Sequence, residues 1–280
     1  MFRVEKMKAE DFPFGIQLSN TMDWNMAEPD FEFMTKLEPE GCFVLWQDQE
    51  RVGMATCINY GRTGWFGNLV VKKDYRGKSA GTFLLKHAVK YLKNKGVETI
   101  GLYAYQHLVG FYQSAGFKPH DELLILTGKP INATGKRLNV VEASENDLPM
   151  LIGFDQQFLS WNRKKLFEEI MREEEKLCYV SELNGEIAGF AMAKVYDEIA
   201  EVGPLICDPG QPHLAIKLVE AILGTLRKSE IYAYVNSINE FILETIMKAG
   251  LKQSFRLTRM FLGPFLAQDC VYMPESLERG

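Results

Sequence analysis

The stretch Asn68–Leu85 reads NLVVKKDYRGKSAGTFLL, and it is the most informative segment of the sequence. An apolar strand ends at Val71, a short polar turn follows, and small residues around Gly77 open a long amphipathic helix. The first turn of a helix has unpaired backbone N–H groups and the positive end of the helix dipole, so it attracts anions. Arg76 and Lys78 add positive charge there. The segment therefore predicts a binding site for a diphosphate.

Two common phosphate-binding motifs do not fit this stretch. A Walker loop built on Gly77–Lys78–Ser79 would need a glycine at position 72, where the sequence has Lys72. The dinucleotide fingerprint GxGxxG is also absent from the stretch. An enzyme that acts on nucleotide phosphates is therefore the weakest of the alternatives considered.

The segment resembles the coenzyme A signature of the GCN5-related N-acetyltransferase (GNAT) family, [RQ]-x-x-G-x-[GA], which follows L-x-V-x-x-x-x-R-G. The matching residues are Leu69, Val71, Arg76, Gly77 and Gly81. Ser79 departs from the pattern, because the family usually has glycine there. Serine is small, and we expect its hydroxyl to cap the following helix.

Two other segments extend the resemblance. The run Gly110–Phe117, GFYQSAGF, resembles the Y-x-x-x-G-F of the family. Trp24–Asn25 with Asp30 and Gly41–Phe43 resembles a GWN…D…GF pattern of members that carry a second GNAT-like domain. Together these residues imply a tandem GNAT protein.

The rest of the chain repeats one order of elements. Each half predicts a strand, two helices, three strands, a helix, a strand, a helix and a strand. In the first half the strands are expected at 2–6, 42–46, 52–60, 65–71, 97–104 and 123–126, with helices at 10–22, 30–37, 79–94 and 107–115. In the second they are expected at 138–143, 177–182, 187–195, 200–207, 230–235 and 256–261, with helices between 144 and 175 and at 213–227 and 240–249.

These elements predict an α/β protein with two tandem domains. Each is expected to have a central mixed, mostly antiparallel sheet flanked by helices. The boundaries are set at residues 1–130 for the acetyltransferase domain and 137–280 for a degenerate second domain. The stretch Leu126–Arg137, LTGKPINATGKR, has the Gly, Pro and Thr content of a linker. Asn184–Gly185 predicts a two-residue hairpin turn.

The resemblance also implies a chemistry. In GNAT proteins the fourth strand splays from the fifth, and the pantetheine arm of acetyl-CoA lies in the gap. Backbone N–H groups of Leu69, Val70 and Val71 would hold that arm and polarise the thioester, and an amine would attack directly. The expected contacts of the rest of the cofactor are Arg76, Gly77, Lys78, Ser79, Ala80, Gly81, Thr82 and His107.

Tyr112 occupies the position of a tyrosine that commonly protonates the leaving thiolate in the family. The alternative is an aromatic core residue, because Phe111 and Phe117 flank it. For His107 the alternative is a structural or surface role.

The loop between the first two helices supplies the candidate substrate residues, which are Asp23, Trp24, Asn25 and Asp30. The two aspartates could instead be helix caps or surface charges, and Trp24 could be part of the core. Asp23 and Asp30 are also the candidates for the general base, and no acidic residue lies within Trp65–Val71.

The second half lacks the cofactor signature. Its equivalent segment, Ile206–His213, reads ICDPGQPH. Asp208 places a negative charge where a pyrophosphate would lie, and Pro209 and Pro212 remove backbone donors. We therefore expect this half to bind no coenzyme A and to serve as a packing partner that shapes either the substrate cleft or a dimer surface.

Composition excludes several classes of function. A net charge of −5 and a pI near 5.6 give no basic footprint for nucleic acid. The four histidines and five cysteines show no metal-ligand spacing, so we expect no metal and free, mostly buried thiols. No apolar run of about 18 residues or signal peptide is found, so we expect a cytoplasmic protein without a membrane span.

Two functional hypotheses remain. The first is an N-acetyltransferase that moves an acetyl group from acetyl-CoA to a primary amine of a small molecule or a peptide. The second is a non-catalytic protein that binds acyl-CoA or another metabolite. Fold analogy supports the cofactor better than the substrate, and the sequence leaves a homodimer open.

Overall fold

The computed structural model describes residues 1–133, 139–159, 161–173, 175–266 and 268–280. In the first half the elements are β1 (Phe2–Lys6), α1 (Phe12–Asn20), α2 (Glu28–Leu37), β2 (Cys42–Gln47), β3 (Glu50–Asn59), β4 (Thr63–Val71), α3 (Ala80–Asn94), β5 (Thr99–Ala104), α4 (Val109–Ser114) and β6 (Lys118–Gly128). The second half contains β7 (Val140–Glu142), α5 (Leu148–Phe158), α6 (Lys164–Arg172), β8 (Lys176–Leu183), β9 (Glu186–Tyr196), β10 (Ile199–Cys207), α7 (Pro212–Thr225), β11 (Glu230–Asn236), α8 (Glu240–Ala249), β12 (Lys252–Leu262) and β13 (Val271–Met273).

The predicted repeat of elements is confirmed. Both halves follow the expected order from their first strand to β6 and β12, and among the α-helices and strands given above β13 is the one that the sequence pattern did not predict. The hairpin turn between β8 and β9 is confirmed as well. Asn184 and Gly185 have φ angles of 55° and 84°, and positive φ at both positions is what a type I′ turn requires.

One continuous sheet joins the two halves. Its strands lie in the order β1-β2-β3-β4-β5-β12-β6-β11-β10-β9-β8-β7, with β13 paired to β10. Most neighbours are antiparallel, whereas β4–β5 and β10–β11 are parallel. The mixed, mostly antiparallel character expected for the sheet is thus confirmed.

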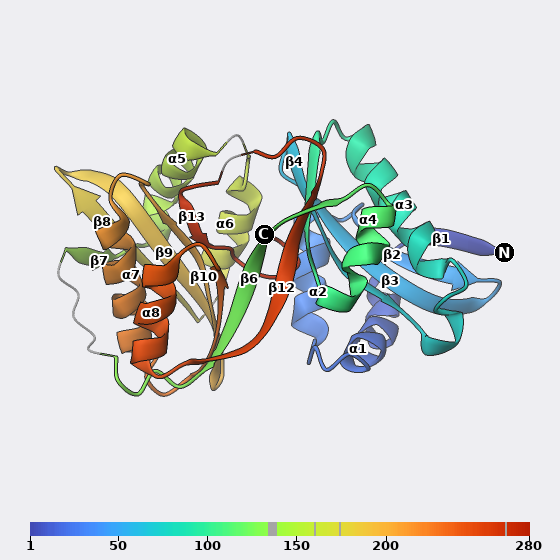
Figure 1. Cartoon of the computed structure of the whole chain (residues 1–280), viewed down its shortest axis with the longest axis horizontal. Coiled ribbons are helices and arrows are strands. Elements are labelled where there is room, and N and C mark those ends of the chain that lie inside the picture. Colours follow the sequence, from blue (N-terminus) through green and yellow to red (C-terminus); the bar gives the residue numbers. More distant parts are fainter. Residues whose placement is uncertain (134–138, 160, 174, 267) are drawn as a thin grey trace.

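The halves exchange their last strands. β12, from the end of the second half, lies between β5 and β6, while β6, from the end of the first half, pairs with β11 on its other side. Figure 1 shows these two strands side by side where the halves meet. Because each half completes the other's sheet, the arrangement of the two halves is fixed by backbone hydrogen bonds.

The linker predicted at residues 126–137 is only partly a linker. Residues 126–128 belong to β6, where Leu126 pairs with Ala233 of β11 and with Gln253 of β12. The exchange of strands explains the error, because it extends β6 beyond what its own half requires. Residues 134–138 lie outside the described residues.

The helices cover the two faces of the sheet separately. On one face, side chains of α1, α2, α5 and α6 form a single core that includes Phe31 and Phe167. On the other face, α3 and α4 cover the first half and α7 and α8 cover the second, each pair over its own core. We call these the α1/α2 face and the α3/α4 face of the first half.

Candidate active site

The fourth strand of the first half parts from the fifth. Their parallel pairing runs from Thr63↔Thr99 to Trp65↔Gly101 and stops there. Residues 66–71 therefore have no ladder partner on the β5 side among the described residues. This open edge of β4 runs along Leu69, Val70 and Val71, the stretch that the sequence predicted to hold an extended ligand, and the N–H groups of alternate residues face it.

A β-bulge lies at the point where the two strands separate. Met54 of β3 pairs with Val70 and Thr56 pairs with Gly67, so β4 has one residue more than β3 in this interval. Asn68 has a positive φ of 52°, and its amide nitrogen donates to the Thr56 hydroxyl at 3.2 Å. The bulge bends β4 and re-aims its backbone, which is how bulges often act beside ligand sites.

The turn after β4 leads into the N-terminus of α3. Gly77 has a φ of 72°, and a methyl group added there would meet no atom within 4 Å, so this side of the turn is open. No hydrogen bond to the backbone N–H groups of residues 77–82 is found in the described part of the chain. A row of free N–H groups at the start of a long helix is the feature on which the predicted diphosphate site depends.

Ser79 occupies the position where the family usually has glycine, and its backbone shows why. Its φ is 64°, in the left-handed region that favours glycine. The expectation that its hydroxyl caps α3 is wrong, because no side-chain hydrogen bond forms at this cap. A left-handed residue does not have the extended backbone from which a capping side chain reaches forward.

The side chains of the two basic residues of the turn make different contacts. The Nε of Arg76 donates to the Val71 carbonyl at 3.0 Å, which fixes the stem of the side chain beside the end of β4. Its Nη2 lies 3.4 Å from the Met22 sulfur, so the loop after α1 lies next to the turn. The ammonium of Lys78 lies 6.0 Å from the centre of the Tyr75 ring. Both side chains are on an exposed turn.

Tyr112 lies on α4, on the α3/α4 face of β4. Its ring is 6.5 Å from that of Phe66 on β4 and packs between Phe111 and Phe117. Only 6% of the residue is exposed, and burial raises the pKa of its phenol above the ordinary value. The phenol is therefore held protonated at neutral pH, as a proton donor must be. His107 is exposed and stacks on Tyr105, 5.8 Å away.

The predicted substrate residues lie at the start of α2 and in the loop before it. Asp30 accepts the Ala27 N–H at 2.8 Å, so it does form the helix cap that was the alternative for it. Trp24 is partly buried and donates from Nε1 to the Tyr105 hydroxyl at 3.1 Å. Asp23 and Asn25 are exposed, with φ angles of 57° and 52°. Trp24 is the member of this set that lies beside the end of β5.

The corresponding gap in the second half is filled by the chain itself. β10 and β11 pair only from Ile199↔Glu230 to Val202↔Ala233, and β13 then pairs with β10 through Leu205↔Met273. The amide of Asn236 on β11 donates to the Val271 carbonyl at 3.2 Å. Beyond β10, the Asp208 carboxylate accepts the Gly210 N–H at 2.8 Å. A strand thus occupies the place that stays free of a strand between β4 and β5.

Comparison with known proteins identifies the family. A model of the Acetyltransferase (GNAT) family matches residues 4–117, and a model of an Acetyltransferase (GNAT) domain matches residues 151–272. The chain belongs to the GNAT acyltransferase family. It consists of two tandem GNAT domains, as the sequence predicted. A search of curated protein sequences found no match.

Several solved structures share the GNAT fold over nearly the whole chain. An acetyltransferase candidate from Pyrococcus horikoshii is 22% identical, with a TM-score of 0.83 over 100% of this chain and 96% of its own. A tandem GNAT protein from the clavulanic acid biosynthesis pathway is 11% identical, with a TM-score of 0.66 over 95% and 100%. N-myristoyltransferase of Saccharomyces cerevisiae, with bound myristoylCoA, is 12% identical, with a TM-score of 0.68 over 93% and 82%. These likenesses concern the fold.

Sequence reasoning did not find the residues that cover the α1/α2 face of β4. Glu278 lies directly over Gly67, and the indole of Trp65 contacts Gly280. A glycine within a strand often marks a close approach by another part of the chain, and Gly67 was such a signal. The partner could not be read from the sequence, because more than two hundred residues separate it from β4.

Three further observations concern the described residues. Among them, no group of three or more His, Cys, Asp or Glu side chains could hold a metal ion. No helix in the same residues is long and apolar enough to cross a membrane. All five cysteines are buried and free, as expected.

Proposed function

We propose that this GNAT protein transfers an acetyl group from acetyl-CoA to a primary amine of a small molecule or peptide, by direct attack of the amine. The observation that carries the proposal is the continuity of one path through the first half. The path starts at the gap between β4 and β5, passes the bulge at Asn68, and ends at the free N–H groups of residues 77–82. Such a path suits a thioester at one end and a diphosphate at the other.

The residues present fit an acyl-CoA. Arg76 and Lys78 supply positive charge beside the helix N-terminus, and the open side of Gly77 leaves the backbone free to approach a diphosphate. Leu69, Val70 and Val71 would hold the pantetheine arm along β4. When bound, the acyl-CoA supplies an activated thioester carbonyl. The remaining predicted contacts, Ser79, Ala80, Gly81, Thr82 and His107, stay part of this proposal.

Tyr112 is our candidate for the group that protonates the departing thiolate. It sits on the α3/α4 face of the gap, and its burial keeps the phenol protonated through neutral pH. A buried phenol is a weaker acid than an exposed one, but a thiolate that forms beside it in the same apolar surroundings is destabilised too. Asp23, Trp24, Asn25 and Asp30 are proposed to border the amine substrate.

The gap between β4 and β5 and the gap between β10 and β11 suggest different roles for the two halves. We propose that residues 1–130 bind the cofactor and that residues 137–280 do not. β13 occupies the space in the second half that a pantetheine arm would need, and Asp208 takes up an N–H group at its helix entrance.

The alternative function is binding of an acyl-CoA without catalysis. Ser79 favours this alternative, because a left-handed serine brings a Cβ to a turn where the family keeps the backbone bare. The apolar packing of Tyr112 favours it as well, since a ring enclosed by Phe66, Phe111 and Phe117 has a sufficient structural reason to be aromatic.

Release of free thiol from acetyl-CoA separates the two functions. The purified full chain is mixed with acetyl-CoA and, in turn, spermidine, tyramine, glucosamine, lysine and an alanyl dipeptide. We expect thiol release that depends on at least one amine and disappears in Arg76→Glu. Arg227→Glu makes the same charge change at an exposed position after α7 and serves as the matched control. Binding of acetyl-CoA without turnover on any amine would instead support the non-catalytic alternative.

A further inference from the structure

The segment 275–280 bridges the two halves on the α1/α2 face. At its start, a methyl group added to Gly203 of β10 would fall 3.2 Å from the Glu275 Cα. Near its end, a methyl group added to Gly67 of β4 would fall 2.4 Å from the Glu278 Cβ. The Tyr60 hydroxyl also donates to the Arg279 carbonyl at 3.0 Å. Strands of both halves thus hold the segment against the sheet, and it reaches the bulge of β4 from the second half.

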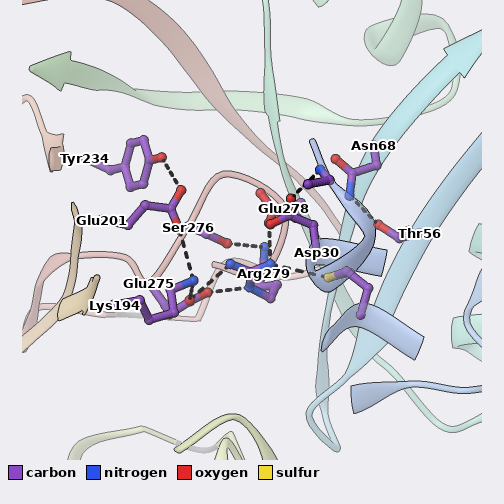
Figure 2. A network of polar contacts seen from close by, with 12 residues as sticks. Asp30, Thr56, Asn68, Lys194, Glu201, Tyr234, Glu275, Ser276, Glu278 and Arg279 are labelled. Atoms are coloured by element: carbon purple, nitrogen blue, oxygen red, sulfur yellow. Dashed lines mark hydrogen bonds and ion pairs between the residues drawn. The ribbon is translucent and has the colours of Figure 1, made fainter. Parts of the chain in front are cut away.

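A buried ionic network anchors the segment, as Figure 2 shows. Arg279 binds Glu275 through two nitrogens, at 2.6 Å and 3.1 Å, and binds Glu278 at 2.5 Å. Lys194 of β9 lies 2.5 Å from Glu275 and 3.0 Å from Glu201 of β10. The side chains of Glu275, Lys194 and Arg279 are at most 4% exposed. Charges this deep are tolerated only when they are paired.

The network contains more carboxylates than cations. Two cations face three carboxylates, so one negative charge is left without a full counterion. Arg279 and Lys194 overcome the effect of burial at Glu275 and lower its pKa to about 2. At Glu278 burial dominates and Arg279 offsets it only in part, so the pKa of this carboxyl is raised. Glu278 is therefore the member of the network that is most ready to accept a proton.

Glu278 and Tyr112 lie on opposite faces of one strand. Phe66 and Gly67 are consecutive residues of β4, so their side-chain directions point to opposite faces of the sheet. Tyr112 packs against Phe66 on the α3/α4 face, while Glu278 covers Gly67 on the α1/α2 face. The Glu278 side chain keeps 19% of its surface exposed, whereas Glu275, Lys194 and Arg279 are at most 4% exposed and Glu201 is 25% exposed. The Glu278 carboxyl group therefore has a fixed position at the bulge and can be reached by a small chemical group.

We propose that Glu278 is the general base of the acetyl transfer, supplied by the second half to the site of the first half. The inference rests on the proposed function. The segment 275–280 sets its position, and the bulge at Asn68 is where β4 and Glu278 meet. This arrangement favours an amine that is protonated in solution. The Glu278 carboxylate first attracts the ammonium group by its negative charge and then accepts a proton from it.

The transfer removes two protons from the substrate ammonium. The Glu278 carboxylate takes one proton from the substrate ammonium, which frees the nitrogen lone pair. The N–C bond forms at the acyl carbon, and the C–S bond breaks with its electron pair on sulfur. The second proton lost by nitrogen goes to solvent, and Tyr112, the candidate donor to the thiolate, regains its proton from solvent. Glu278 finally returns its proton to solvent, so the products are an amide, a free thiol and one proton.

Glu278→Gln tests the proposal with the amine that the wild type accepts from the panel named above. General bases contribute about 10²–10⁴-fold to rate, so we expect kcat at pH 7 to fall by about a hundredfold or more. We expect acetyl-CoA affinity, measured by calorimetry, to stay within about twofold. The rate of the variant should rise with pH up to the amine's own pKa, because free amine then forms without a base. Glu278→Asp should recover part of the turnover.

Glu201→Gln is the matched control within the same network. The negative charge of Glu201 raises the pKa of Glu278, so its removal should move the acidic limb of the rate profile to lower pH without abolishing turnover. The other charged or titratable groups facing Glu278 are Glu275, Lys194, Arg279, Tyr60 and Tyr234, and they stay unchanged in this variant.

The outcomes distinguish this inference from the function on which it rests. A folded Glu278→Gln variant with kcat within about threefold of wild type and an unchanged acidic limb would overturn the role of Glu278 alone. An acidic limb that does not move in Glu201→Gln would overturn it too. Failure of the wild type to bind acetyl-CoA or to turn over any amine would overturn the proposed function, and this inference with it.

Discussion

Gly67 and Glu278 are in van der Waals contact across the boundary between the two halves. No side chain fits between them, because an added Cβ at Gly67 would lie 2.4 Å from the Glu278 Cβ and 2.7 Å from its Cα. Gly67 lies beside the bulge of β4, and Glu278 lies in a segment anchored to β9 and β10. The geometry of the first half's site therefore depends on residues at the far end of the sequence.

Gly67→Ala is predicted to displace the segment that carries Glu278. The clash is with the backbone and Cβ of Glu278, so no rotation of a flexible side chain can relieve it. Overpacking of this kind costs about 1–3 kcal/mol. We expect a lower free energy of unfolding in denaturant and a loss of turnover. Gly153→Ala, in α5, has open space for its methyl group and is the control that should keep both.

Ser79→Gly is predicted to stabilise the protein. A left-handed backbone costs a non-glycine residue about 1–2 kcal/mol, and glycine removes that cost while adding some entropy to the unfolded chain. We expect a net gain of about 0.5–1 kcal/mol in denaturant unfolding and acetyl-CoA binding at least as tight as in wild type. Ser79→Ala keeps the left-handed strain, so a similar gain in this variant would show that relief of backbone strain is not the cause.

The stability of the network is predicted to depend on pH in two opposite ways. The raised pKa of Glu278 means that its contribution to stability is present below its ordinary pKa of 4.5 and is lost as pH rises through its folded value. Glu278→Gln should therefore be more stable than wild type at pH 8, and its gain in stability over wild type should be smaller at pH 5. Equal differences from wild type at both values, measured by denaturant unfolding, would contradict the raised pKa.

Glu275 is predicted to behave in the opposite sense. Its pKa is lowered to about 2, so its contribution is present above its ordinary pKa of 4.5 and is lost as pH falls toward 2. The same unfolding series, extended to pH 3, should show the loss in wild type. Glu275→Gln leaves Arg279 and Lys194 without their shared partner and should unfold more easily than wild type at pH 7.

Tyr112→Phe is predicted to separate catalysis from packing. The ring lies among aromatic side chains, and no hydrogen bond of its hydroxyl is found in the described part of the chain. The variant should unfold at nearly the same denaturant concentration as wild type. If the phenol protonates the thiolate, kcat should fall by about tenfold or more while acetyl-CoA affinity is kept. Unchanged kcat would assign Tyr112 to the core.

Local patterns predicted most of the fold. The strand, turn and helix around Arg76 follow from an apolar run, small residues and an amphipathic repeat, and the structure has them in place. Asn184–Gly185 predicted its hairpin because few other dipeptides accept positive φ at both positions. These features depend on neighbours in the sequence, which a single sequence displays.

Long-range pairings were not predictable in the same way. The strands β6 and β12 have the same apolar character whether they close their own half or the other one, so nothing local distinguishes exchange from closure. The position of Glu278 was unpredictable for the same reason, because it depends on a contact with Gly67 in the other half. At Ser79 the sequence showed the departure from glycine. It did not show the left-handed backbone, which is the reason that glycine is favoured at this position.

Calorimetric titration of the full chain with acetyl-CoA is the decisive test of the cofactor site in the first half. We predict one equivalent bound per chain, loss of binding in Arg76→Glu, and retention in Arg227→Glu. One equivalent follows from the open gap beside β4 and the gap beside β10 that β13 fills. Two equivalents, equal binding in Arg76→Glu, or no binding by folded wild-type protein would contradict it.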